Sequence, residues 1–123
     1  MQPFPAWRRA LIPLATLLYL TMLVLGATLT VLPDPLQQSN DKLLHLLAYG
    51  GLAGLLFLGL QRPTLQRYGI VILTIAVLGG VDEAIQSLFP HRHSDVMDWL
   101  ADVAAACGVC LGLSVLRQYH RAI

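Results

Sequence analysis

The stretch that decides the fold runs from Asp82 to Asp102 and reads DEAIQSLFPHRHSDVMDWLAD. It holds five of the seven acidic residues of the chain, namely Asp82, Glu83, Asp95, Asp98 and Asp102. Apolar segments long enough to lie in a bilayer flank it on both sides. Inserting an ionisable group at membrane depth costs roughly 2.5–3.5 kcal/mol of free energy. We therefore expect a chain that keeps several such groups to need them for its function.

The composition is typical of a membrane protein. The 123 residues are 56% hydrophobic and only 12% charged, whereas about 25% of the residues in a soluble domain are charged. The net charge of +1 gives no reason to expect nucleic-acid binding. The two cysteines, Cys107 and Cys110, lie in an apolar segment. We interpret them as small packing residues rather than as a redox or metal pair.

Four apolar runs predict an all-α, polytopic membrane protein, with residues 1–123 forming one domain that is a bundle of four transmembrane helices. We expect the spans at about residues 10–32, 43–60, 68–89 and 95–116. Each is near the ~20 residues that a bilayer core requires. Pro13 falls in the expected first turn of the first span, while Pro63 and Pro90 end the second and third.

Basic residues are unevenly divided between the two ends of these spans. Six fall at the ends that alternating spans place on one side: Arg8, Arg9, Arg62, Arg67, Arg117 and Arg121. The other side carries Lys42 and Arg92 together with all seven acids. The positive-inside rule therefore predicts a multi-pass membrane protein with both termini in the cytoplasm.

Polar stripes occur on three of the expected helices, always near the outward end. In lipid such stripes must face one another or a water-filled cavity. We therefore predict one shared binding site at the outer face. Its candidate residues are Lys42, His45, Tyr49, Asp82, Glu83, Gln86, Arg92, Ser94, Asp98 and Asp102.

Three of these residues combine membrane depth with reactive chemistry. Glu83 or Asp98 is a candidate general base, and His45 is a candidate acid because histidine titrates near neutrality. Together the three offer ligand types that suit a divalent metal ion; no other cofactor is expected. The alternative is structural: His45 bonds a facing carboxylate, and the acids form a buried polar network that fixes the helix register.

The same residues resemble the pattern of the VanZ-like family of small bacterial membrane proteins. That pattern pairs Asp-Lys-x-x-His-x-x-x-Tyr with Glu-x-x-Gln, an Arg, and a downstream Asp followed by polar and small residues. The matching positions here are Asp41, Lys42, His45, Tyr49, Asp82, Glu83, Gln86, Arg92, Ser94 and Asp98. Asp102 departs from it, since the family usually has Asn there. The resemblance covers about residues 41–112. It implies a four-helix domain in the bacterial cytoplasmic (inner) membrane, with a link to low-level resistance to teicoplanin-type lipoglycopeptides.

Three functions are compatible with these features. The first is a protein that binds or protects an envelope lipid, a lipid-linked envelope precursor or a lipoglycopeptide, with Arg92 and Lys42 meeting the head group. The second is an integral-membrane enzyme that acts on a lipid head group, with or without a metal ion. The third is a small proton- or cation-coupled transporter that uses the acids as a relay.

We predict that a reporter domain fused after Ile123 lies in the cytoplasm, because six of the eight basic residues fall on that side. A fluorescent protein fused there should fluoresce, and alkaline phosphatase at the same position should be inactive. An active phosphatase fusion after Ile123 would reverse the predicted orientation.

Overall fold

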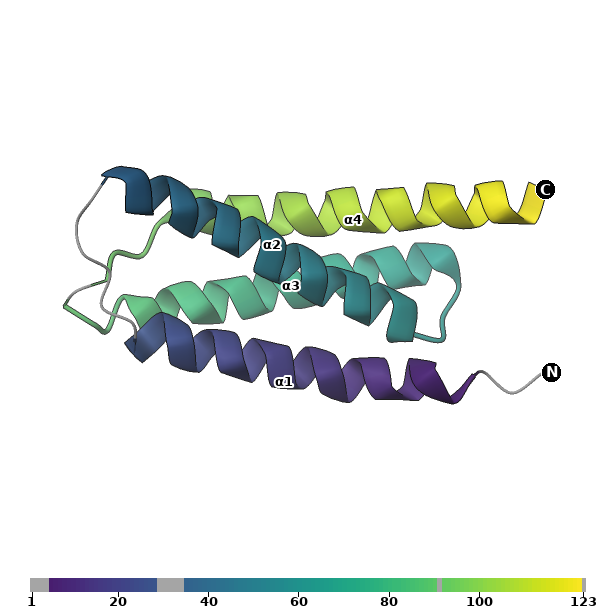
Figure 1. Cartoon of the computed structure of the whole chain (residues 1–123), viewed down its shortest axis with the longest axis horizontal. Helices are drawn as coiled ribbons and strands as arrows, with labels where there is room; N and C mark the ends of the chain where they lie inside the picture. Colours follow the sequence, from purple (N-terminus) through teal and green to yellow (C-terminus); the bar gives the residue numbers. More distant parts are fainter. Residues whose placement is uncertain (1–4, 29–34, 91, 123) are drawn as a thin grey trace.

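The computed structural model describes residues 5–28, 35–90 and 92–122, with the side chains of all of these except residues 35–41. Within these ranges the chain forms α-helices joined by short connections, and no strand occurs (Figure 1). The helices are α1 (Ala6–Thr28), α2 (Pro35–Gly59), α3 (Thr64–Gln86) and α4 (Val96–Ala122).

All four helices are long and apolar enough to cross a membrane. Large apolar side chains cover their outer faces, among them Leu17 on α1, Leu47 on α2 and Leu73 on α3, each more than 60% exposed. Such a surface suits lipid rather than water. The predicted all-α bundle of four transmembrane helices is confirmed, and the chain is a multi-pass membrane protein.

Several helix ends lie beyond the predicted apolar spans, because polar residues continue the helices. α2 begins at Pro35 instead of residue 43, and proline is favoured at the first helical position. α3 begins at Thr64 instead of residue 68, directly after Pro63. α4 begins at Val96, after an N-cap in which Asp95 Oδ1 accepts a 2.8 Å hydrogen bond from the Met97 N–H, and it continues to Ala122 instead of residue 116.

Two other predicted bounds are corrected around prolines. α3 ends at Gln86, three residues before the predicted end, because Pro90 cannot donate to the Gln86 carbonyl and its ring crowds that turn. α1 begins at Ala6 instead of residue 10, so that Pro13 lies inside the helix and not in its first turn. Residues 29–32 of the first predicted span lie outside the described residues.

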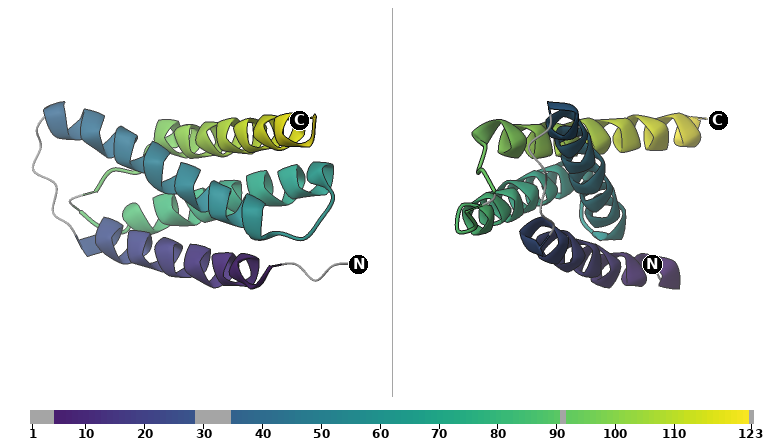
Figure 2. Two further views of the ribbon diagram at one scale, coloured as in Figure 1. Left: turned by 45° about the vertical axis from the view of Figure 1, so that its right-hand side comes forward. Right: turned by 60° about the vertical axis from the view of Figure 1, so that its left-hand side comes forward.

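Helix α2 crosses the bundle diagonally and contacts the other three helices (Figures 1 and 2). α1 packs on α2 and α3, and the Tyr19 hydroxyl donates a 3.0 Å hydrogen bond to the Leu78 carbonyl of α3. The middle of the bundle is an apolar core. Its buried residues are Ala15, Tyr19, Tyr49, Leu52, Ala53, Phe57, Val71, Ile75, Ala106 and Cys110.

The helices alternate in direction, so the molecule has two distinct ends (Figure 1). The C-terminal ends of α1 and α3 and the N-terminal ends of α2 and α4 lie at one end, which we call the acidic end because it carries the acids between residues 82 and 102. The start of α1, the end of α4 and the α2–α3 connection lie at the other, which we call the terminal end. Since the six arginines named above flank the termini and that connection, they gather at the terminal end.

A glycine permits the close approach of α3 and α4. A Cβ atom at Gly79 would lie 3.1 Å from Asp102 Oδ2 and 3.2 Å from Trp99 Cδ1. At Gly80, one residue on, the nearest atom would be Trp99 Nε1 at 3.9 Å, an ordinary contact. Only the first of these neighbouring glycines is therefore required by packing.

We predict that Gly79→Ala lowers the free energy of unfolding by about 1–3 kcal/mol, the usual cost of overpacking. The matched change Gly80→Ala should stay within about 0.5 kcal/mol of the parent protein. Unfolding of the purified protein by SDS in mixed micelles measures both. Equal stability of the two variants would contradict the close packing at Gly79.

Candidate functional site

The rim of the acidic end is an ion-pair layer between α2 and the start of α4. Lys42 Nζ lies 3.7 Å from Asp95 Oδ2 and 3.9 Å from Asp98 Oδ1. The Lys42 side chain is 45% exposed, whereas that of Asp98 is only 12% exposed. Lys42 therefore lies at the exposed edge of the site. Of its two carboxylate partners, Asp98 is the more deeply buried.

Below the rim, three helices bring reactive side chains together. His45 of α2, Glu83 of α3 and Asp98 of α4 each offer one ligand atom, and these atoms lie within 4.8 Å of one another. Glu83 is fixed from one side, because its Oε2 accepts a 2.8 Å hydrogen bond from the Asp95 backbone N–H. These are the three residues that the sequence singled out as reactive, and the fold places them at one point.

The deepest layer joins a histidine and a tyrosine of α2 to carboxylates of α3 and α4. His45 Nδ1 lies 3.2 Å from Asp102 Oδ1, and Asp102 is fully buried. The Tyr49 hydroxyl donates a 3.1 Å hydrogen bond to Asp82 Oδ2. The rings of His45 and Tyr49 are nearly parallel, with centroids 5.9 Å apart. α2 thus holds both acids from one face.

Asp82 and Glu83 serve different partners although they are adjacent. The Asp82 side chain turns toward Tyr49, and that of Glu83 turns toward Asp95 and the side chain of Ser94. Neighbouring residues of a helix point about 100° apart, so α3 supplies one carboxylate to each side of the site. Both are buried, with 5% and 7% of their surface exposed.

A small cavity of about 150 Å³ lies beside the deepest layer, toward α1. Its wall combines the polar groups of His45, Tyr49, Asp82 and Gln86 with apolar side chains. The apolar part of the lining is Met22, Leu25, Leu44 and Ala48, with Gly26 between them. One side of the cavity therefore carries polar groups, and the other suits a hydrocarbon chain.

Two carboxylate oxygens of the site have no hydrogen-bond partner among the described residues. They are Glu83 Oε1 and Asp102 Oδ2, and both atoms are buried. A buried charged oxygen without a partner costs more than an unpaired neutral group. A proton or a cation at these oxygens would offset that cost.

The predicted residues do not all converge. The Arg92 side chain turns toward α1 instead, where its Nε donates a 2.8 Å hydrogen bond to the Gly26 carbonyl. The other nine candidates lie in the layers and the cavity just described. His91 and the side chain of Asp41 lie outside the described residues.

Sequence reasoning missed the contribution of α1. The cavity residues Met22, Leu25 and Gly26 carry no polar signal, so nothing in the sequence distinguishes them from lipid-facing neighbours. It also missed that the Asp95 backbone N–H positions Glu83. The N-cap signature of Asp95 before an apolar run could have indicated a fixed backbone there.

Comparisons with known proteins leave the site to be interpreted from its own geometry. The chain matches no family model, no curated protein and no solved structure.

Proposed function

We propose that this membrane protein holds a divalent cation between His45, Glu83 and Asp98 and uses it to bind the head group of an envelope lipid or a lipid-linked envelope precursor. The observation that carries the proposal is the convergence of three ligand atoms within 4.8 Å. Tetrahedral ligands at about 2.1 Å from a zinc ion lie roughly 3.4 Å apart. Small side-chain movements therefore suffice to close the three groups around an ion.

The groups that contact His45 and Glu83 also suit a metal ion at this site. A histidine that ligates a metal usually donates its other ring N–H to a carboxylate, and His45 Nδ1 faces Asp102 at 3.2 Å. With Nδ1 directed at Asp102, Nε2 would be the coordinating nitrogen. The Asp95 N–H holds Glu83 Oε2 and leaves Oε1 without a partner, so one oxygen is fixed and the other is available.

The charge balance favours a cation as well. Asp82, Glu83, Asp98 and Asp102 are all buried, while Lys42 reaches only the rim and Arg92 turns to Gly26. Isolated buried carboxylates are strongly unfavourable, and a metal ion or a proton relieves them. A bound cation also provides the attraction for an anionic head group that the excess of acids would otherwise repel.

The nature of the ligand follows from the surroundings of the site. At the acidic end the site has a half-exposed lysine, Lys42, and the cavity beside Tyr49 has an apolar wall from α1 and α2. An amphipathic molecule in the outer leaflet matches both surfaces. The six arginines at the terminal end support an outward-facing site. The resemblance to the VanZ-like family supports a location in the inner membrane and extends the candidate ligands to teicoplanin-type lipoglycopeptides.

Metal-assisted hydrolysis of a lipid head group is the second candidate. Three protein ligands leave a coordination position for water, which is the arrangement of catalytic zinc sites. Transport has less support, because fully buried apolar residues fill the bundle below the site, including Leu52, Ala53 and Ala106.

The test titrates the metal-free protein in detergent with Zn²⁺ and, separately, with Mn²⁺, and measures binding by isothermal titration calorimetry. We expect one ion per chain. Glu83→Gln should weaken its affinity about 100-fold or more, because loss of a direct ligand costs more than the roughly 10–100-fold typical of residues that only orient a ligand. Asp95→Asn is the matched control: it removes the same charge at the rim, where the side chain is 39% exposed, and should change affinity only a few-fold.

Native mass spectrometry then tests the head group. Lipid-linked precursor should bind to the metal-loaded protein, lose affinity when a chelator is added, and bind weakly to Glu83→Gln. No metal binding, or equal binding by Glu83→Gln and Asp95→Asn, contradicts the cation site. Metal binding without any effect on precursor binding contradicts the head-group part alone.

A further inference from the structure

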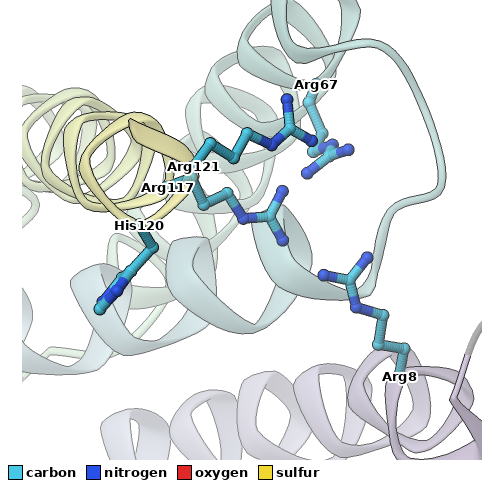
Figure 3. A pocket seen from close by; sticks show the side chains of 5 residues that line it. All are labelled: Arg8, Arg67, Arg117, His120 and Arg121. Atoms are coloured by element: carbon cyan, nitrogen blue, oxygen red, sulfur yellow. The ribbon is translucent and has the colours of Figure 1, made fainter. Parts of the chain in front are cut away.

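A second polar site lies at the terminal end, and the apolar core separates it from the acidic end. It is a cavity of about 470 Å³ lined by Arg8 of α1, Arg67 of α3 and the last turns of α4. The α4 residues in its wall are Arg117, His120 and Arg121. Figure 3 shows the guanidinium groups of Arg8, Arg67 and Arg117 directed toward a common space.

Two of these arginines contact an aromatic ring, and no carboxylate of the described residues forms an ion pair with them. The Arg67 and Arg117 guanidinium carbons lie 5.3 and 5.7 Å from the centroid of the Phe57 ring, within the range of cation–π attraction. Phe57 is fully buried. One aromatic ring therefore orders two guanidinium groups from different helices before any ligand arrives.

Buried donors at this cavity have no acceptor. Arg67 is only 9% exposed; its Nε and Nη2 donate to the Arg62 carbonyl at 2.9 and 2.6 Å, but its Nη1 has no hydrogen-bond partner among the described residues. Arg117 Nη2 is also buried and without a partner there. Unused guanidinium donors of this kind fit the oxygens of a phosphate group.

Repulsion among the arginines of the cavity also favours the binding of an anion. Arg117 experiences the charges of Arg67, Arg8 and Arg121, and no aspartate or glutamate occurs in residues 1–33, 43–81 or 103–123. Orientation in the membrane requires positive charges on one side but not their convergence. Arg9 and Arg62 meet that requirement without lining the cavity.

We propose that this cavity binds a phosphate group, supplied by an anionic lipid of the surrounding leaflet. The position favours a lipid source, because the cavity lies at the ends of the spans where head groups are found. Two aromatic side chains typical of the membrane interface contact residues that line it. Trp7, 54% exposed, lies beneath the Arg8 guanidinium, and Tyr119, 65% exposed, packs against His120. Basic pockets between transmembrane helices bind lipid head groups in this way. The site is independent of the cation site at the acidic end.

The experiment titrates the full chain, in neutral detergent micelles, with dioleoyl phosphatidic acid and follows binding by native mass spectrometry. Arg117→Gln should weaken binding about tenfold or more, because it removes charge-assisted hydrogen bonds. Arg121→Gln, an exposed residue of the same cavity, should also weaken it and loses no buried packing. Arg9→Gln is the matched control and should change the affinity by less than about twofold, because Arg9 is an exposed arginine of the same end outside the cavity.

Competition with inorganic phosphate identifies the source of the phosphate group. If millimolar phosphate leaves the lipid bound, the lipid is the ligand; if phosphate displaces it, the site exists but takes a soluble anion, and the lipid assignment is wrong. Equal affinities for Arg117→Gln, Arg121→Gln and Arg9→Gln would show attraction by net charge only and would overturn the site. Glu83→Gln should leave this binding unchanged, so the outcome is separate from that of the cation site.

Discussion

The arrangement of this bundle depends on one constraint, that a charged side chain cannot face lipid without a large free-energy cost. Glu83, Asp98 and Asp102 come from two helices and are nearly inaccessible to the surroundings. Each must therefore find its partner on another helix or in the connecting loop. α2 provides several of those partners: Lys42 lies near Asp98 and His45 contacts Asp102, while Tyr49 bonds the neighbouring Asp82. These contacts tie α2 to α3 and α4 at the acidic end.

The same constraint separates the molecule into two chemically opposite ends. Carboxylates gather at one end and guanidinium groups at the other, and an apolar core that includes Leu52, Phe57 and Ile75 fills the space between them. Neither end neutralises itself within the described residues, because each holds buried polar atoms without partners. Two ligands of opposite charge, a cation and a phosphate group, satisfy this pattern without any contact between the ends.

Much of this organisation could be predicted from the sequence, because apolar length and helical spacing are local properties. The four helices follow from them, and so does the shared face of Lys42, His45 and Tyr49. The helix ends could not be placed as well, since Pro35 starts a helix in a segment that reads as a linker. The role of α1 was not visible because Met22 and Leu25 look like any lipid-facing residues. The arginine cavity was hidden because Arg67 and Arg117 already had a role in membrane orientation.

The central claim is that α2, α3 and α4 direct polar side chains to one shared site at the acidic end. The most direct measurement is a high-resolution structure of the protein in a lipid bilayer, determined with divalent cation present. The account predicts that His45, Glu83 and Asp98 surround a single peak of ion density, with Asp102 behind the histidine. Side chains of these three residues that point in separate directions, with no common space between them, would contradict it.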